Sequence, residues 1–147
     1  MKDRFVLLVE DDSDHVALML RSLHKYEMAD DVLVMLDGAE ALDFLFGRGA
    51  FVGRDTSVLP CVVLLDLRLP KVSGLEVLEQ IRQEPRTSHL PVVVLTSSAS
   101  DEDIAESYRR GANSFVRKPT GFREFLDAIR YLLDYWTEWN QTPVTGH

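Results

Sequence analysis

The stretch CVVLLDLRLP, residues 61–70, decides the fold class of this chain. Its five leading apolar residues are unbroken rather than alternating, which is typical of a strand buried on both faces of a parallel sheet. Asp66 ends the run, and residues 73–76 (SGLE) then carry a helix start with a Glu three places after the Ser. A buried strand followed closely by a helix is one βα unit, so the stretch predicts an α/β protein.

Four further apolar runs have the same character: residues 5–9, 32–36, 92–95 and 114–116. Segments whose apolar residues recur at helical spacing follow the runs. The expected core-facing stripes include Val16, Met19, Leu20 and Leu23 in the first helix, Ile104, Ala105 and Tyr108 in the fourth, and a line from Phe122 to Trp136 in the last. Five such alternations predict a doubly wound sheet of five parallel strands with five helices.

Composition narrows the classes of function. Sixteen Lys and Arg against 24 Asp and Glu give the 147-residue chain a net charge of −8, which argues against binding nucleic acid or an anionic membrane surface. The single cysteine excludes an intrachain disulfide, and we expect Cys61 to be an inert buried thiol. With no apolar run near the length of a membrane span, we expect a cytoplasmic domain over residues 1–140 and a tail over 141–147.

Polar residues follow the apolar runs. The first run is followed by Glu10 and Asp11, the third by Asp66, the fourth by Thr96 and the fifth by Arg117 and Lys118. Because ligands bind at the carboxyl ends of the strands in such sheets, we expect these side chains to converge. Crowded carboxylates favour a bound cation, and oxygen ligands of this kind suit Mg²⁺. A lysine and a hydroxyl beside them would suit a transferred phosphoryl group.

A set of short motifs occurs in order between residues 4 and 138. They are Val9-Glu10-Asp11, Leu64 to Pro70, Ser73-Gly74, Val93 to Ser97, Gly111-Ala112-Asn113 and Lys118-Pro119. In these motifs the chain resembles the response-regulator receiver domains of bacterial two-component systems. Through residues 66–71, residues 94–98 and the aromatic last helix, it is most similar to single-domain regulators that partner phytochrome-type histidine kinases.

The resemblance implies a flavodoxin-like receiver domain over residues 1–140 with strand order 2-1-3-4-5 and no output domain. It implies that Asp66 accepts a phosphoryl group from a phosphohistidine of the kinase, and that Thr96 and Lys118 contact that group. Mg²⁺ would be held by Asp11, Asp66, the Arg68 backbone carbonyl and Glu10, the last directly or through a water. Phe115 falls at the aromatic switch position of the family, and an unidentified downstream protein would receive the signal.

Two residues depart from the commonest family pattern. Arg68 lies two places after Asp66, where many receivers carry a neutral amide or Met, and Ser98 lies two places after Thr96, where others carry an acid or amide. Both flank the path of a hydrolytic water, so they bear on the lifetime of the phosphoryl group.

Other functions fit part of the pattern. Haloacid-dehalogenase-type phosphatases also use a strand-end Asp with Mg²⁺, but they need a second Asp where this chain has Arg68. A receiver-like interaction module that never takes phosphate is a further alternative, although Asp66, Thr96 and Lys118 are all present. Neither GxxxxGK[ST] nor GxGxxG occurs, which argues against nucleotide binding.

Several candidate residues also have a purely structural interpretation. Glu10 and Asp11 are acids of the kind that cap helices. Taken singly, Asp66 could be a loop acid and Lys118 a solvated surface lysine. Agreement of five motifs at successive strand ends favours the functional interpretation. The peptide bond between Lys118 and Pro119, whether cis or trans, predicts a fixed turn that directs the Lys118 side chain inward.

Two further expectations concern the surface. We expect His15 to face solvent, because it falls early in the first helix. Tyr131, Tyr135 and Trp139 recur every four residues on a line distinct from the core stripe, which predicts a homodimer built on the last helix. The alternative is that these rings fold over the edge of their own helix and complete the core.

Overall fold

Five short parallel strands form the central sheet, and they are the apolar runs of the sequence. A computed structural model describes residues 5–25 and 32–143. The strands are β1 (Val6–Val9), β2 (Val32–Met35), β3 (Val62–Leu65), β4 (Val92–Thr96) and β5 (Ser114–Arg117). They pair in the order β2-β1-β3-β4-β5, and every pairing is parallel. The predicted fold class and strand order are confirmed.

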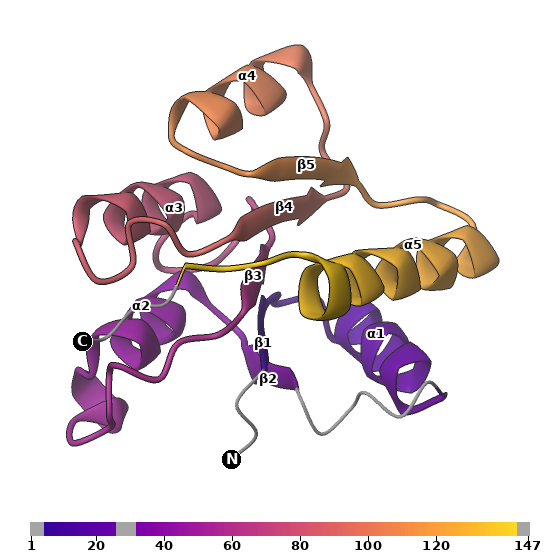
Figure 1. The fold of residues 1–147 in the computed structure, drawn as a ribbon. Coiled ribbons are helices and arrows are strands. Elements are labelled where there is room, and N and C mark those ends of the chain that lie inside the picture. Colours follow the sequence, from indigo (N-terminus) through magenta and orange to yellow (C-terminus); the bar gives the residue numbers. More distant parts are fainter. Residues whose placement is uncertain (1–4, 26–31, 144–147) are drawn as a thin grey trace.

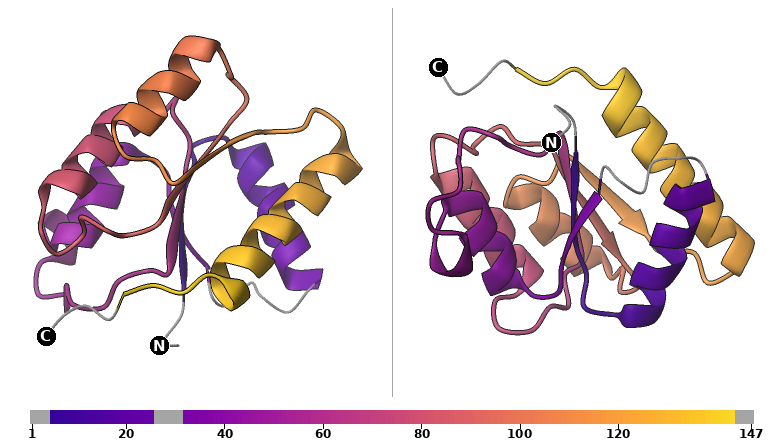
Figure 2. Two further views of the ribbon diagram at one scale, coloured as in Figure 1. Left: turned by 45° about the horizontal axis from the view of Figure 1, so that its top comes forward. Right: turned by 90° about the horizontal axis from the view of Figure 1, so that it is seen from below.

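Helices cover both faces of this sheet (Figures 1 and 2). They are α1 (Ser13–Lys25), α2 (Gly38–Phe46), α3 (Gly74–Gln83), α4 (Asp101–Arg109) and α5 (Phe122–Asp134). Figure 2 shows α1 and α5 on one side of the strands and α2 and α3 on the other, with α4 beside α3. A short 3-10 helix, Gly49–Phe51, lies between α2 and β3, and a π-helical turn, Tyr135–Trp139, extends α5. Among the described residues, no helix combines the length and apolar character needed to cross a bilayer.

Side chains of the unbroken apolar runs pack into two separate hydrophobic cores, one on each face of the sheet. In β1, Leu7 and Val9 pack with α2 and α3, whereas Val6 and Leu8 pack with α1 and α5. β3 and β4 divide their side chains between the two faces in the same way. Because successive side chains of a strand point to opposite faces, a strand covered on both sides has no polar position left.

Side-chain caps begin α1, α2, α3 and α4, and the cap of α3 is Ser73, the helix start that the sequence predicts. The Asp37 side chain accepts a hydrogen bond from the Glu40 backbone N–H, and Ser73 does the same for Glu76. At α1, Asp12 Oδ1 accepts from the backbone N–H groups of Asp14 and His15 at 3.0 and 3.2 Å. The acid that caps this helix is therefore Asp12, and Glu10 and Asp11 are left for another role.

Some sequence expectations about packing are wrong. Phe122 is 56% exposed, because it is the first residue of α5 and lies over a surface groove beside Arg21 of α1 rather than on the sheet. Tyr108 of α4 is also exposed, and Ser107 is the buried residue of that helix. Cys61 is only partly buried, since β3 begins one residue later.

Gly74 lets α3 start directly against the end of β3. A Cβ at this position would lie 2.2 Å from the Asp66 carbonyl oxygen and 2.6 Å from the Leu67 Cα. Both are backbone atoms, so no side-chain rotation would relieve the overlap. The Gly74 N–H donates to the Leu67 carbonyl at 3.0 Å, which ties the helix start to the segment carrying Asp66.

Candidate functional site

A cavity of about 390 Å³ opens where the carboxyl ends of the strands meet. It is lined by Glu10, Asp11, Asp12, His15, Asp66, Arg68, Thr96, Ser97, Ser98 and Lys118. The residues that the sequence singles out at four strand ends are thus brought together, as the topology of a parallel sheet requires. Arg68, Ser98, Asp12 and His15 join them from the following loops and from the start of α1.

Asp66 lies at the floor of this site. It directly follows β3, is 7% exposed, and receives hydrogen bonds on both carboxylate oxygens. Thr96 Oγ1 donates to Oδ1 at 3.1 Å, the Arg68 backbone N–H donates to the same oxygen at 3.0 Å, and Lys118 Nζ donates to Oδ2 at 2.9 Å. Burial alone raises the pKa of Asp66, but the Arg68 N–H and the Lys118 ammonium outweigh it, so this pKa lies below its ordinary value.

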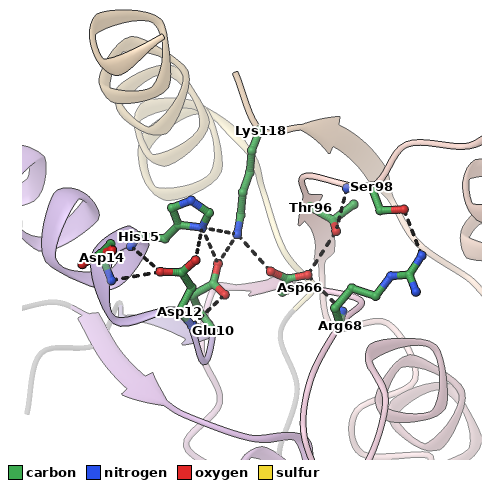
Figure 3. A network of polar contacts seen from close by, with 9 residues as sticks. All are labelled: Glu10, Asp12, Asp14, His15, Asp66, Arg68, Thr96, Ser98 and Lys118. Carbon is green, nitrogen blue, oxygen red and sulfur yellow. Dashed lines mark hydrogen bonds and ion pairs between the residues drawn. The ribbon is translucent and has the colours of Figure 1, made fainter. Parts of the chain in front are cut away.

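Lys118 reaches the site from the residue after β5. Its backbone N–H donates to the Thr96 carbonyl at 2.8 Å, which continues the β4–β5 pairing beyond the strand and directs the side chain inward. The side chain is almost fully buried and donates to Glu10, Asp66 and His15 (Figure 3). Residues 5–25 and 32–143 contain no cis peptide bond, so the turn at Pro119 is trans.

Glu10 is the buried acid next to Asp66. It is 2% exposed, and the Lys118 ammonium is its ionic partner. Removal from water raises the pKa of its carboxyl from 4.5 to about 7, because this effect exceeds the attraction of the Lys118 ammonium and the nearby Asp66 charge adds to it. In the metal-free protein, Glu10 therefore takes up a proton near neutral pH.

Arg68 carries a polar bridge across the mouth of the site. Its guanidinium donates to Ser98 Oγ at 3.0 Å and lies 3.6 Å from Asp103 Oδ2, and Ser98 Oγ donates to Asp103 Oδ2 at 2.9 Å. The bridge joins the loop after β3 to the first turn of α4. Asp103 lies in the first turn of α4, where an acid complements the helix N-terminus, and its contact with Arg68 is an addition from the structure.

His15 is the site residue that the sequence interpretation missed. Its Nδ1 lies 2.8 Å from Lys118 Nζ, and the side chain is 28% exposed, so the expected solvent-facing position is wrong. The spacing of His15 could have predicted this position. His15 is four residues before Met19 and eight before Leu23, so it lies on the same face of α1 as these two buried residues. The apolar stripe of α1 continues through His15 to the edge of the site.

Thr96 and Phe115 lie on adjoining strands, as the predicted strand order requires. Thr96 ends β4 and Phe115 lies in β5 opposite Val94. Phe115 is partly buried against the core beneath α2 and α3. Because Thr96 Oγ1 already donates to Asp66, only a small further movement is left for it to reach a group attached to that carboxylate.

The three aromatic residues of the last helix do not fold over the core. Tyr131 is 69%, Tyr135 51% and Trp139 72% exposed, whereas Trp136 packs on the apolar cluster beneath α1 and α5. The π-helical turn holds Tyr135 and Trp139 at the end of α5. Their exposure disagrees with the alternative in which these rings complete the core.

The response regulator receiver domain family matches residues 6–130 of this chain. The chain therefore belongs to the response-regulator receiver domains, the signalling proteins of two-component systems. The probable methanogenesis regulatory protein FilR2 of Methanothrix harundinacea is 41% identical over 139 residues, covering 94% of this chain and 86% of FilR2. Response regulator Rcp1 of a Synechocystis strain is 32% identical over 141 residues, covering 96% and 94%.

Solved structures agree with this assignment. The phosphorylated cyanobacterial phytochrome response regulator RcpA superposes with a TM-score of 0.87 at 29% identity, over 95% of this chain and 98% of RcpA. The Mn²⁺-bound form of Rcp1 gives 0.85 at 30% identity, over 95% and 99%. The bacteriophytochrome response regulator AtBRR gives 0.73 at 43% identity, over 96% and 98%. The similarity to phytochrome-linked regulators that the sequence suggested is thus confirmed.

Proposed function

We propose that Asp66 is the phosphoacceptor of this receiver domain and takes its phosphoryl group from a phosphohistidine of a histidine kinase. The observation that carries the proposal is the pair of donors on Asp66: Lys118 Nζ on one oxygen and Thr96 Oγ1 on the other. An Asp66 oxygen attacks phosphorus while the P–N bond to the histidine breaks. The bonding electron pair goes to the imidazole nitrogen, which then takes a proton.

The electrostatics of the site support this step. The lowered pKa keeps Asp66 ionised at neutral pH, as a nucleophile must be. A phosphoryl group on Asp66 would place new anionic oxygens beside the Lys118 ammonium and the Thr96 hydroxyl, both already directed at this carboxylate. Donors fixed before the reaction stabilise the transition state without reorganisation.

Mg²⁺ fits the chemistry of the donor set. Glu10, Asp11 and Asp66 supply carboxylate oxygens at the cavity, and the Arg68 backbone carbonyl would complete the ligands. Among the described residues, no three acidic or ligating side chains already stand in a metal-binding arrangement, because Glu10 and Asp66 face the Lys118 ammonium. When bound, Mg²⁺ would neutralise charge on the transferring phosphoryl group. The Mn²⁺-bound form of Rcp1 supports a divalent cation here.

A phosphatase of the haloacid-dehalogenase type is disfavoured by Arg68. That chemistry needs a carboxylic acid two residues after the nucleophile. Here the position carries a cation that is already engaged with Ser98 and Asp103. The role proposed for this chain is therefore that of a phosphoacceptor in signalling.

Phosphorylation would switch the surface formed by α4, β5 and α5. Thr96 and Phe115 lie on adjoining strands, and α4 buries only Ser107 among its residues. A helix with so little buried surface costs little free energy to move. Phosphoryl contacts that favour one position of Thr96 would therefore shift the population of α4 and Phe115 together. Phe115 lacks a hydroxyl, so its rotation would change packing rather than make a new hydrogen bond.

The kinase we propose is of the phytochrome type. The support is the set of phytochrome-linked regulators among the similar structures, RcpA and AtBRR included. Transfer from a purified phytochrome-type histidine kinase, measured beside a kinase of another class, tests this proposal. Equal transfer rates from both would contradict it.

We also propose a homodimer that pairs through Tyr131, Tyr135 and Trp139. Three exposed aromatic side chains on one helix form a patch of the kind that interfaces use, and aromatic residues favour interface centres. Light scattering behind a sizing column gives the mass, with and without beryllofluoride. A monomer in both conditions contradicts the dimer, and a dimer that survives Tyr135→Ala with Trp139→Ala places the interface elsewhere.

Acetyl phosphate with Mg²⁺ tests the central proposal. Intact-mass spectrometry should show one added phosphoryl group on the wild-type chain and none on Asp66→Asn. EDTA should abolish the labelling. Equal labelling of the Asp66→Asn variant, or labelling unaffected by EDTA, would refute the assignment of Asp66.

A further inference from the structure

Lys118 uses all three of its ammonium protons inside the site. Its Nζ donates to Glu10 Oε1, lies 2.9 Å from Asp66 Oδ2 and lies 2.8 Å from His15 Nδ1 (Figure 3). An ammonium group has three donors and no acceptor, so these three contacts satisfy it completely. With 4% of Lys118 exposed, water has little access to replace a lost partner.

This contact assigns the tautomer of His15. A lysine ammonium only donates, so Nδ1 of His15 must present its lone pair, and the ring proton must lie on Nε2. His15 therefore accepts from Lys118 through Nδ1, which also lies 3.5 Å from Asp12 Oδ2 and 3.8 Å from Glu10 Oε1. Asp66, by contrast, is an anionic acceptor, because its lowered pKa keeps the carboxyl ionised.

His15 is held in place through both its backbone and its ring. Its backbone N–H donates to the capping residue Asp12 at 3.2 Å, within the first turn of α1. Its ring packs against Phe125 of α5, with centroids 5.4 Å apart and planes inclined by 30°. Phe125 is itself buried in the core. The acceptor atom thus stands on a rigid support at the junction of α1, α5 and the end of β5.

Loading the site would change both carboxylate contacts of Lys118, whereas its third partner, His15, is not a carboxylate. A divalent cation bound at the carboxylates would engage oxygens of Glu10 and Asp66, and a phosphoryl group would convert Asp66 into an acyl phosphate whose phosphoryl oxygens lie beside Lys118. His15 Nδ1 takes part in neither change. We therefore expect the contact with His15 to persist when the site is loaded.

We infer that His15 is a positioning residue for phosphoryl transfer: its Nδ1 holds the Lys118 ammonium beside Asp66 while the carboxylates are engaged elsewhere. The inference rests on the proposed phosphoacceptor role of Asp66. It assigns His15 no contact with the phosphoryl group and no proton transfer. Its effect reaches the reaction through the direction of one buried cation.

Two substitutions at His15 test the hydrogen-bond acceptor and the aromatic ring independently of each other. His15→Phe keeps a ring against Phe125 and loses the acceptor, whereas His15→Asn places an amide oxygen near the Nδ1 position and loses the ring. With saturating Mg²⁺ and acetyl phosphate, we expect His15→Phe to lower the limiting phosphorylation rate about tenfold, since misplaced catalytic groups cost rate more than binding. We expect an unchanged donor KM and recovery to within about threefold in His15→Asn.

A second readout does not depend on phosphorylation. In protein labelled with ¹⁵Nζ-lysine, the Lys118 ammonium should give a proton-coupled signal protected from exchange, assigned by its loss in Lys118→Arg. The signal should persist in His15→Asn and disappear in His15→Phe. Thermal unfolding of each variant checks the fold, and His15→Leu replaces His15→Phe if the larger ring is not accommodated.

The inference is overturned if His15→Phe matches the wild type in rate and ammonium signal. It is also overturned if His15→Asn falls as far as His15→Phe, since the ring and not the acceptor would then matter. A wild-type chain that takes no phosphoryl group contradicts the proposed function instead. The ammonium signal of His15→Phe then decides the role of His15 by itself.

Discussion

The titration of Glu10 should control the stability of the metal-free protein. Its pKa is about 7 in the folded chain against 4.5 for the free side chain, so the folded state holds the proton more tightly. The free energy of unfolding is then highest when Glu10 is protonated and falls as the pH rises through this interval. Well above pH 7, Glu10 is ionised in both the folded and the unfolded chain, so its titration lowers the free energy of unfolding no further.

The magnitude follows from the two pKa values. Between pH 5 and pH 8, linkage gives a loss of roughly 2–3 kcal/mol from this residue, on the order of a quarter of the stability of a typical domain. In Glu10→Gln the amide does not titrate, so this part of the pH dependence disappears. The difference between the two proteins reports Glu10 together with the effect that its charge has on Asp66, because the other titrating groups are common to both.

Urea unfolding in EDTA, followed by circular dichroism at several pH values, measures this difference. The wild type should lose roughly 2–3 kcal/mol relative to Glu10→Gln between pH 5 and pH 8. Mg²⁺ competes with the Glu10 proton, so its apparent affinity for the wild type should rise about tenfold from pH 6 to pH 8. Parallel pH curves for the two proteins, or a wild type that gains stability relative to the variant, would refute the reasoning.

Three further substitutions test the surroundings of the site. Gly74→Ala should lower the free energy of unfolding by about 3 kcal/mol in urea titrations, because its Cβ would meet backbone atoms of the segment carrying Asp66; a change below about 1 kcal/mol would show that α3 moves freely. Arg82→Met should cost about 3 kcal/mol in the same assay, because the guanidinium donates to the carbonyls of Gly111, Ser88 and Leu90 and to Asn113 Oδ1. Arg68→Ala should shorten the lifetime of the phosphorylated protein several-fold in a phosphate-release assay, since it opens the bridge across the site and removes a cation; an unchanged or longer lifetime contradicts this role.

Most of the fold could be predicted because its signals are local. Unbroken apolar runs report strands covered on both faces, and capping residues such as Asp37 and Ser73 mark helix starts within a few residues. The packing of single helices was predicted less well. Phe122 and Tyr108 fit a helical stripe, yet both are exposed, because apolar spacing does not tell where along its length a helix meets the sheet.

By itself, the sequence determined which residues would meet in the site, since the carboxyl ends of parallel strands share one edge of the sheet. Glu10, Asp66 and Lys118 converge as that rule requires. Only the tertiary structure decided how they are paired. The contact of His15 with Lys118 joins residues 103 positions apart. It depends on the angle at which α1 and α5 pack and on the reach of two side chains, and neither quantity is written in local periodicity.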